Sequence, residues 1–305
     1  MNNQPINIML VEDNPGDARL ISELLKEARG KNYQLDHVDR LAAGTEHIKN
    51  GSVDIVLLDL GLPDCSGLDG LTAVKGIADQ VPIVVLTGLD DEAVAVAAVQ
   101  TGAQDYLVKG QVDGNLLWRA IRYAIERKQL ERKLAYIATH DSLTGLPNRF
   151  LLKDRLALAI TQSERKGTSL AVLMLDLDGF KYVNDSLGHS MGDEVLKSAA
   201  ERLTGVVRAY DTVARLGGDE FILLLTEIES VSTVEDIAGR IIALFNEPFN
   251  LGPFAARVTT SIGIAMYPDH GSDPETLLRN ADTAMYRVKG EGRCNFAVCR
   301  GTSGP

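Results

Sequence analysis

The first third of the chain repeats one pattern, in which a short apolar run of strand length is followed by a longer amphipathic stretch. The apolar runs are rich in Val, Ile and Leu and cover residues 6–11, 33–38, 54–58, 83–86 and 105–108. Strands that alternate with helices predict a parallel sheet with helices on both faces, a doubly wound α/β fold. In such folds the functional site lies outside the carboxyl ends of the strands. The residues at those ends therefore indicate what this half does.

Polar side chains suited to phosphate chemistry follow four of the five predicted strands. Glu12 and Asp13 end the first strand, Asp59 the third, Thr87 the fourth and Lys109 the fifth. Carboxylates gathered at one edge repel one another unless a cation neutralises them, and oxygen ligands suit Mg²⁺. A hydroxyl and an ammonium group can hold the oxygens of a phosphoryl group. Each residue by itself is explained as an ordinary polar strand end, but the set of five predicts a metal-dependent phosphoryl site.

The segments around these residues resemble the receiver domain of response regulators. The resemblance covers about residues 5–125 and is carried by segments 11–14, 57–60, 62–64, 86–88 and 106–110. It implies a flavodoxin-like fold in which Asp59 accepts phosphate from a histidine kinase. The other roles that it implies are Mg²⁺ ligation by Glu12, Asp13, Asp59 and the carbonyl of Gly61, a switch pair of Thr87 and Tyr106, and a site lysine, Lys109. Tyr106 is equally well explained as a static aromatic residue.

Residues 115–139 contain neither Pro nor Gly and predict one long helix. Apolar residues recur along it at steps of four and three, which is typical of a coiled-coil seam, with one polar interruption at Arg127. The seam consists of Leu116, Ala120, Tyr123, Arg127, Leu130, Leu134 and Ile137. A second stripe, Leu117, Ile121 and Ile125, predicts packing against the sheet of the first half. We expect a dimeric helical stalk, and the alternative is a single amphipathic helix packed on its own domain.

The second half places further carboxylates near a predicted hairpin. Three strands are predicted, over residues 170–177, 212–216 and 221–225. Gly217 and Gly218 separate the last two strands and favour a two-residue turn, because glycine adopts positive φ. The turn presents Asp219 and Glu220 at its tip. If the hairpin lies beside the strand that contains Asp176, three carboxylates converge in a site for two hard cations, as in enzymes that align nucleotide triphosphates.

These residues belong to a set of motifs that resembles the GGDEF domain of diguanylate cyclases. The signature is segment 215–221, and the supporting segments are 141–149, 176–181, 184–185, 188–189, 192–193 and 281–293. Because several motifs occur in the right order over residues 138–296, the resemblance is specific. It implies a central, largely antiparallel sheet similar to the palm of nucleotidyl cyclases and polymerases. It also implies GTP as substrate, Mg²⁺ or Mn²⁺ as cofactor and cyclic di-GMP as product.

The resemblance further implies a role for each motif residue. The implied metal ligands are Asp176, the carbonyl of Leu177 and Asp219. Asp219 or Glu220 is implied to help deprotonate the 3′-hydroxyl. Asn184 and Asp193 read the guanine edge, which favours guanine over adenine, and helix capping is the alternative for both. The residues implied to contact phosphate are Gly179 and Phe180 through backbone N–H groups, and Lys181, Lys289 and Arg293 through side chains.

Arg208 and Asp211 precede the hairpin at the spacing of the family's inhibitory RxxD motif. The resemblance implies product binding there, with Arg208 stacked on a guanine and Asp211 accepting from its edge. Arg240 is a further candidate contact. The alternative is a surface ion pair, which contributes little. The sequence departs from the family pattern at Cys294, in a run that usually reads Gly-Arg-Asn, and at Gly179, where His is common.

Composition argues against several other classes of protein. The net charge is −11, and both halves are acidic, with −6 over residues 1–140 and −5 over residues 141–305. This charge argues against nucleic-acid binding and against a DNA-binding response regulator. No apolar run approaches the length of a membrane span, and the three cysteines do not form a disulfide framework. We therefore expect a cytoplasmic protein without membrane contact.

The sequence predicts four parts, namely a receiver domain over residues 1–114, a stalk over 115–139, a GGDEF domain over 140–300 and a tail over 301–305. The predicted function is that of a phosphorylation-regulated diguanylate cyclase, which joins two GTP molecules into cyclic di-GMP and releases two pyrophosphates. The predicted partners are a histidine kinase, a second copy of the chain in a homodimer, and cyclic di-GMP as product and inhibitor. The alternative is a non-enzymatic signalling adaptor that binds GTP or cyclic di-GMP.

Overall fold

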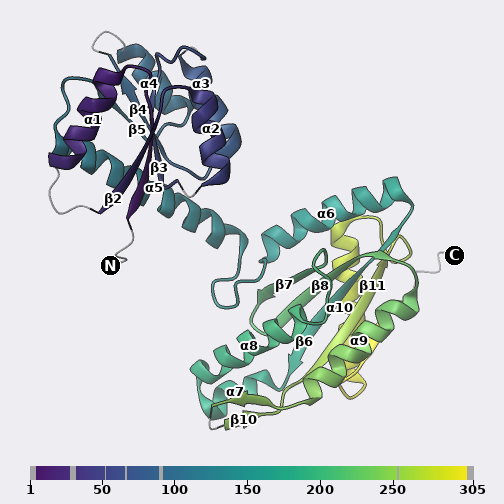
Figure 1. Cartoon of the computed structure of the whole chain (residues 1–305). Coiled ribbons are helices and arrows are strands. Elements are labelled where there is room, and N and C mark those ends of the chain that lie inside the picture. Colours follow the sequence, from purple (N-terminus) through teal and green to yellow (C-terminus); the bar gives the residue numbers. More distant parts are fainter. Residues whose placement is uncertain are drawn as a thin grey trace. The chain divides into compact units, whose positions relative to one another are not determined.

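The computed structural model describes residues 5–27, 32–51, 53–65, 67–88, 92–252 and 254–300. The chain divides into two compact units, residues 1–134 and 135–305, which we name the first and the second unit (Figure 1). The division falls within helix α5 (Gly114–Thr139), so the boundaries proposed at residues 114 and 140 stay predictions. The tail 301–305 lies outside the described residues. Within the described ranges, no helix combines the length and the apolar character needed to span a bilayer.

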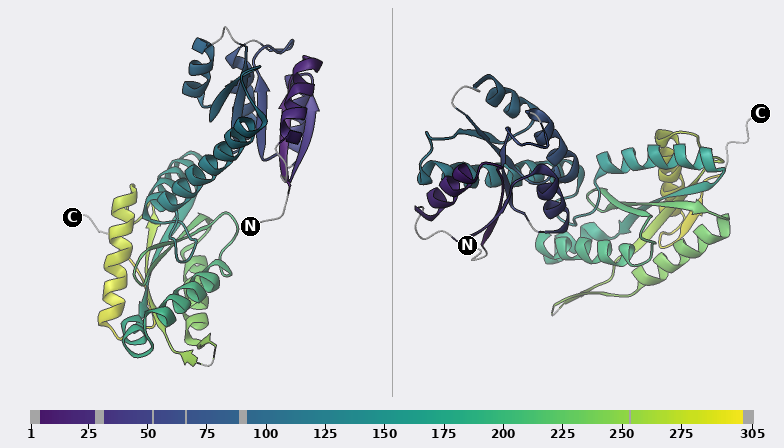
Figure 2. Two further views of the ribbon diagram at one scale, coloured as in Figure 1. Left: turned by 90° about the vertical axis from the view of Figure 1, so that its left-hand side faces the viewer. Right: turned by 45° about the horizontal axis from the view of Figure 1, so that its top comes forward.

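The first unit is a five-stranded parallel sheet in the order β2-β1-β3-β4-β5, with helices on both faces (Figure 2). Its strands are β1 (Ile6–Val11), β2 (Tyr33–Val38), β3 (Ile55–Asp59), β4 (Ile83–Thr87) and β5 (Asp105–Val108). Its other helices are α1 (Pro15–Glu27), α2 (Leu41–Asn50), α3 (Leu68–Ala78) and α4 (Glu92–Thr101). The doubly wound fold expected from the sequence is therefore confirmed.

Alternate residues of β1 supply the two cores of this unit. Ile8 and Leu10 pack in a cluster with α1 and α5, whereas Met9 and Val11 pack in a second cluster with α2, α3 and α4. Because side chains of a strand point alternately to opposite faces, a strand buried on both faces is a continuous apolar run. This burial explains why the sequence marks the strands so clearly.

Strands β3 and β4 each extend one residue beyond their predicted ends. Asp59 pairs with Leu86, and Thr87 pairs with Val108 in the ladder. Both polar residues are therefore the last residues of buried strands, at 7% and 3% exposure. Their backbones are fixed by the sheet, which holds their side chains at its carboxyl edge.

Helix α5 has two different parts. Leu117, Ala120 and Ile121 are buried in the core of the first unit, as the second predicted stripe requires. Farther along, Leu130 and Leu134 are 61% and 67% exposed. The predicted seam therefore does not run the whole length of the helix, because Ala120 packs within its own unit. The exposed apolar stripe begins only after this buried turn.

The second unit has a five-stranded sheet in the order β12-β11-β6-β8-β7. All neighbours are antiparallel except β11 and β12, which are parallel, so the predicted largely antiparallel sheet is confirmed. The sheet strands are β6 (Ser169–Asp178), β7 (Thr212–Gly217), β8 (Glu220–Ile228), β11 (Thr259–Tyr267) and β12 (Phe296–Val298). A separate hairpin consists of β9 (Phe249–Leu251) and β10 (Phe254–Ala256).

Helices cover both faces of this sheet. They are α6 (Arg149–Lys166), α7 (Phe180–Leu187), α8 (His189–Thr204), α9 (Val231–Asn246) and α10 (Pro274–Gly290). One core lies under α7, α8 and α9, and the other lies under α6 and α10, which is the yellow helix at the left of Figure 2. Leu173 of β6 belongs to the first core and Val172 to the second. Strand β6 is thus central and buried on both faces, and its last residues reach the edge where the site forms.

Candidate functional sites

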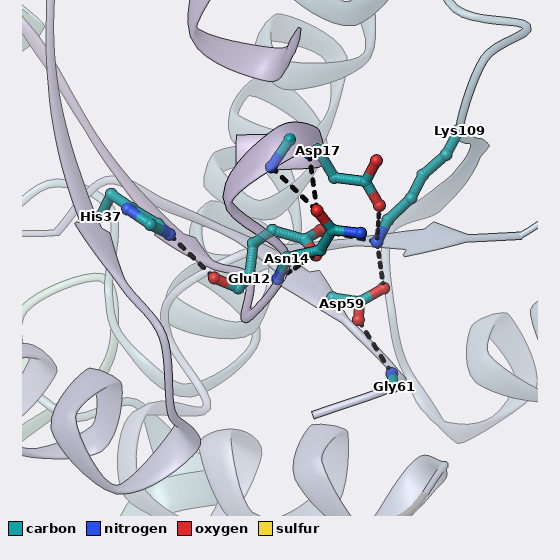
Figure 3. A network of polar contacts seen from close by, with 8 residues as sticks. Glu12, Asn14, Asp17, His37, Asp59, Gly61 and Lys109 are labelled. Atoms are coloured by element: carbon teal, nitrogen blue, oxygen red, sulfur yellow. Dashed lines mark hydrogen bonds and ion pairs between the residues drawn. The ribbon is translucent and has the colours of Figure 1, made fainter. Parts of the chain in front are cut away.

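Lys109, which follows β5, binds three carboxylates at the carboxyl edge of the first sheet. Its ammonium nitrogen lies 2.6 Å from Glu12, 2.7 Å from Asp59 and 3.0 Å from Asp17 (Figure 3). Burial disfavours the charged amine, but hydrogen bonds to Asp59, Glu12 and Asp17 outweigh burial and raise the pKa of Lys109. The lysine therefore stays positively charged and neutralises part of the acidic cluster.

Three carboxylates of this edge are close enough to share one cation. Oxygens of Glu12, Asp13 and Asp59 lie within 4.8 Å of one another. Glu12 is fully buried, and burial raises its pKa even though Lys109 opposes the rise. The backbone N–H of Gly61 donates to Asp59 at 3.0 Å, which brings the loop after β3 next to the acceptor (Figure 3). This donor set contains only oxygen and fits Mg²⁺.

Thr87 and Tyr106 lie on the neighbouring strands β4 and β5. The hydroxyl of Thr87 is buried and has no hydrogen-bond partner among the residues that the structure describes. A buried hydroxyl without a partner is unusual in a native protein and is satisfied when an acceptor arrives. Tyr106 is half-buried and packs against the second core. Both explanations of Tyr106, a switch residue and a static aromatic, remain compatible with this position.

Asp17 is the residue of this site that the sequence did not reveal. It lies in the first turn of α1 and not at a strand end, so the rule that located the other acidic residues passes over it. Asn14, whose side chain accepts from the backbone N–H of Gly16 at 2.8 Å, begins the turn that leads into α1. The only feature of the sequence that could have indicated Asp17 is the short separation along the chain between the end of β1 and the acidic first turn of α1.

In the second unit, the turn between β7 and β8 is held by Arg215. The Nε and Nη2 atoms of Arg215 donate to the carbonyl of Gly218 at 3.1 and 2.7 Å, and Nη1 donates to Asp141 at 2.8 Å. Gly217 and Gly218 both have positive φ, but the turn lies one residue later than predicted, because Gly217 pairs with Glu220 and only Gly218 and Asp219 lie between the strands. Hydrogen bonds from Thr144 and Arg215 outweigh burial and lower the pKa of Asp141. The loop after α5 is thereby tied directly to the turn, a contact that the sequence did not predict.

A cavity of about 400 Å³ lies at the end of β6 beside this turn. It is lined by Asp176, Leu177, Asp178, Gly179, Phe180, Lys181, Asp219, Lys289 and Arg293. The sequence predicts a role for each of these residues except Asp178. Gly179 begins α7 with a φ of 79°, a conformation that glycine adopts without cost. The cavity therefore combines three carboxylates, a helix start and three cations, a combination that suits a metal-bound phosphate chain.

Only some of the charged side chains in this cavity form ion pairs with one another among the described residues. Lys289 pairs with Asp176 at 2.6 Å. Burial and the nearby charge of Asp176 raise the pKa of Asp219, and the same two causes raise the pKa of Glu220. Glu220 pairs with Asp176 in the ladder but lines a neighbouring cavity of about 320 Å³ with Arg149. Of the three predicted carboxylates, Asp176 and Asp219 thus share one cavity and Glu220 lies beside it.

Comparison with known proteins agrees with this division of the chain. Residues 138–295 match the family described as "Diguanylate cyclase, GGDEF domain". The chain belongs to the GGDEF diguanylate cyclase family. Residues 8–122 match the family described as "Response regulator receiver domain". The first unit therefore carries a receiver domain and the second a GGDEF domain, as the two resemblances implied.

Individual relatives cover the chain to different extents. The response regulator PleD of Caulobacter vibrioides is 31% identical over 299 residues, which are 94% of this chain and 64% of PleD. The bifunctional diguanylate cyclase/cyclic di-GMP phosphodiesterase MucR of Pseudomonas aeruginosa is 44% identical over 62% of this chain and 28% of MucR. The solved GGDEF domain of TpbB from P. aeruginosa is 43% identical, with a TM-score of 0.52, over 53% of this chain and 94% of that one. The chain thus spans between about a quarter and two thirds of these two curated relatives.

In the GGDEF domain, Asn184 lies on α7 and Asp193 in the first turns of α8. A Cβ at Gly192 would clash with the amide oxygen of Asn184, so any larger residue there would displace the Asn184 side chain from this position. Helix α8 begins at Gly188 without a side-chain cap, and the N–H of Gly188 bonds the backbone carbonyl of Asn184. Helix capping therefore does not explain either predicted guanine reader within the described chain.

The RxxD residues of the GGDEF domain form no ion pair with each other in the part of the chain that the structure describes. Asp211 accepts from the backbone N–H groups of Arg208 at 3.0 Å and Thr226 at 3.1 Å. Nη1 of Arg208 donates to the Tyr210 hydroxyl at 2.6 Å. The alternative of a simple surface ion pair is therefore wrong for this geometry. Arg240 lies on α9, exposed to solvent.

Proposed function

We propose that the chain is a phosphorylation-regulated diguanylate cyclase that condenses two GTP molecules into cyclic di-GMP. The observation that carries the proposal is the cavity at the end of β6, where Asp176, Asp219, Lys289 and Arg293 meet. A GGDEF domain that had lost its activity would not need to retain carboxylates for metal and cations for a triphosphate in one cavity. The cytoplasmic location expected from the sequence is part of this proposal.

Asp176, Asp219 and the carbonyl of Leu177 are the residues that would hold Mg²⁺ or Mn²⁺. These ions supply charge neutralisation and alignment of the phosphoryl group. The pairing of Lys289 with Asp176 is a resting arrangement. When Asp176 serves as a metal ligand, the Lys289 ammonium becomes available for the β- and γ-phosphates, beside the guanidinium of Arg293. Lys181 lies in the same cavity and offsets charge that develops on the transferring phosphoryl group.

Substrate selection and proton transfer fall to other residues. Asn184 and Asp193 hydrogen-bond the guanine edge, and backbone N–H groups of Gly179 and Phe180 contact phosphate. Asp219 or Glu220 accepts the proton of the 3′-hydroxyl.

One GGDEF domain holds one GTP, so ring closure needs two domains that face each other. Each 3′-oxygen attacks the α-phosphorus of the other nucleotide, one P–O bond forms and one breaks at each centre, and two pyrophosphates leave. The exposed apolar stripe of α5 supports dimerisation, because pairing of two stalks raises the effective concentration of the half-sites.

The receiver domain supplies control. Asp59 accepts a phosphoryl group from a histidine kinase, with Glu12, Asp13 and the carbonyl of Gly61 completing an Mg²⁺ site. Lys109 binds the phosphoryl oxygens, and the buried hydroxyl of Thr87 gains the partner that it lacks among the described residues. Movement of Thr87 toward the phosphoryl group leaves space for Tyr106 and changes the face formed by β4 and β5.

Product feedback acts at Arg208 and Asp211, with Arg240 as an additional contact. The Arg208 guanidinium is exposed, donates to the Tyr210 hydroxyl and lies over the Tyr210 ring, 5.8 Å from its centroid. Stacking on a guanine would use its exposed side. A product dimer that bridges two domains would keep the half-sites apart.

Mass spectrometry tests the activity directly. The purified chain is incubated with GTP and Mg²⁺, and a matched sample receives a chelator in excess of the metal. We expect cyclic di-GMP and pyrophosphate only in the first sample. Binding of GTP without any product at high protein concentration would contradict the enzyme and support the alternative, an adaptor that binds nucleotide and passes a conformational change to a partner.

A further inference from the structure

The turn that follows α10 has an unusual backbone. Arg293 and Cys294 have φ values of 64° and 49°, directly after Gly292 with a φ of 121°. Residues other than glycine rarely adopt positive φ, and such residues are strained unless their surroundings hold them. Two in succession therefore need a specific partner. Arg293 lines the cavity at the end of β6, so the conformation of this turn sets the place of a proposed phosphate-binding side chain.

Asp178, the last residue of β6, holds this turn. Its Oδ2 accepts from the backbone N–H of Cys294 at 3.2 Å and from the hydroxyl of Thr259 at 2.9 Å. Its Oδ1 accepts from the hydroxyl of Ser261 at 2.8 Å and lies 3.9 Å from Nε of Arg293. The Asp178 side chain is 6% exposed. One buried carboxylate thus binds both the backbone of the turn and, more weakly, the Arg293 side chain.

Strand β11, which neighbours β6, holds the Asp178 side chain in place. Thr259 lies opposite Asp178 in the antiparallel β6–β11 ladder, and Ser261 lies opposite Asp176. The hydroxyls of Thr259 and Ser261 therefore reach the carboxylate from a rigid sheet and not from a loop. Both oxygens of Asp178 are occupied by protein donors, which distinguishes it from Asp176, whose side chain pairs only with Lys289 among the described residues. This difference indicates that Asp178 organises the protein, whereas Asp176 can exchange its single lysine contact for a metal ion.

We propose that Asp178 is a positioning residue for triphosphate binding, which fixes the left-handed turn that presents Arg293 to the β- and γ-phosphates. The inference rests on the proposed function, because it takes Arg293 to contact GTP. It assigns Asp178 a purpose that is distinct from metal ligation, although Asp178 lies two residues from a proposed metal ligand.

Two substitutions at this position separate its geometry from its charge. In Asp178→Asn, the amide oxygen can accept from Cys294 and Thr259, while the NH₂ group donates to the hydroxyl of Ser261. The neutral variant therefore retains the turn. In Asp178→Ala all three bonds are lost, and the turn is free to leave its strained conformation. Ser261→Ala removes one bond and serves as a milder variant if Asp178→Ala fails to fold.

The test is titration calorimetry on the full chain with Mg²⁺, using the unreactive α,β-methylene analogue of GTP and, in parallel, GMP, which lacks the β- and γ-phosphates. We expect Asp178→Ala to weaken binding of the analogue about tenfold, because the charge-assisted contact of Arg293 with the phosphates is lost. The affinity for GMP should change by no more than about twofold. Asp178→Asn restores most of the affinity. Thr212→Val, at a buried polar position of β7 near α6, is the control and changes neither affinity.

A double-mutant cycle identifies the route through Arg293. If Asp178 acts by positioning Arg293, the variant with both Asp178→Ala and Arg293→Ala binds the analogue no more weakly than Arg293→Ala. If the two substitutions weaken analogue binding additively, or if Asp178→Ala weakens GMP binding as much as analogue binding, the inference is overturned while the proposed function stands. Unchanged analogue binding by Arg293→Ala would instead overturn the phosphate-binding role of Arg293, and with it the premise.

Discussion

Each unit of the molecule gathers carboxylates at one edge of a sheet, and in each a lysine lies among them, but the two lysines are engaged to different degrees. In the receiver domain, Lys109 contacts Glu12, Asp17 and Asp59 at 2.6–3.0 Å. In the GGDEF domain, Lys289 contacts Asp176 at 2.6 Å, and burial and the charge of Asp176 raise the pKa of Asp219.

This difference suits the two proposed tasks. The receiver site binds one small phosphoryl group and keeps a permanent cation that also compensates the fully buried Glu12. The proposed cyclase site would hold a triphosphate and two metal ions, and its charged groups are mostly not paired with one another: Lys289 contacts Asp176, whereas Asp219 has no ion pair among the described residues. The contacts of Lys109 in the receiver site therefore stabilise the folded domain, whereas the charged groups of the cyclase site contribute less to stability and are available to ligands.

The largest effect should come from the cyclase site. Asp219→Ala removes a proposed metal ligand, and we expect turnover to fall roughly a thousandfold or more, because a catalytic metal contributes several kcal/mol and about 1.4 kcal/mol corresponds to a factor of ten. The measurement is the rate of cyclic di-GMP formation from GTP. Asp236→Ala, an exposed acid on α9, is the control. Turnover above a tenth of the wild-type rate in a folded Asp219→Ala variant would contradict the assignment.

The two lysines provide the sharpest test of the comparison itself. Lys109→Gln leaves buried Glu12 without its counter-charge, and we expect the free energy of unfolding of the receiver domain to fall by about 3 kcal/mol or more. Millimolar Mg²⁺ should restore part of this loss. Urea unfolding followed by fluorescence of Trp118 reports this domain, because Trp118 is the single tryptophan of the chain.

Lys289→Gln is the matched variant in the other site. Lys289 is more exposed and contacts one carboxylate, so we expect the free energy of unfolding to fall by no more than about 1 kcal/mol. Circular dichroism during unfolding measures this change. Equal losses in the two variants, or a Lys109→Gln variant that Mg²⁺ does not stabilise, would show that the two sites do not differ in the proposed way.

Dimerisation connects the two sites and should contribute the next effect. Leu130→Asp with Leu134→Asp places charges on the exposed stripe of α5, and we expect turnover per chain to fall about tenfold or more at low protein concentration. Higher protein concentration should recover it. Gln129→Asp adds one such charge at another exposed position of the helix and should have little effect. A loss that does not depend on protein concentration would argue against a dimeric stalk.

The smallest effect should come from the product site. Arg208→Ala should raise the cyclic di-GMP concentration needed for half-inhibition by about tenfold, since one charge-assisted contact is lost. Arg240→Ala should cause a smaller rise. Inhibition curves measured at fixed GTP give both values. Identical curves for Arg208→Ala and the wild type would reduce the RxxD motif to a structural turn.

Much of the fold and most of both sites could be predicted from the sequence, because buried strands are continuous apolar runs and chemistry-bearing residues follow them directly. Asp59 and Thr87 were located in this way, although each belongs to its strand and does not follow it. Most residues that line the cavity at the end of β6 could likewise be predicted, because they lie within short sequence motifs.

The contacts that the sequence did not reveal join residues far apart along the chain. Asp17 meets Lys109 across 92 positions, Asp141 meets Arg215 across 74, and Asp178 meets Cys294 across 116. Local periodicity carries no information on such pairs. The extent of the coiled-coil seam was misjudged for a related reason, because spacing along a helix does not show that Ala120 is already buried in the helix's own unit.

The account's central claim is that phosphorylation of one acidic site controls catalysis at the other. The direct test measures the rate of cyclic di-GMP formation by the full chain with GTP and Mg²⁺, with and without beryllofluoride, in the wild type and in Asp59→Asn. Asp79→Asn, an exposed acid at the end of α3, is the control. The account predicts a higher rate with beryllofluoride in the wild type and in Asp79→Asn, and no response in Asp59→Asn. An equal rate with and without beryllofluoride in the wild type, or a full response in Asp59→Asn, would contradict it.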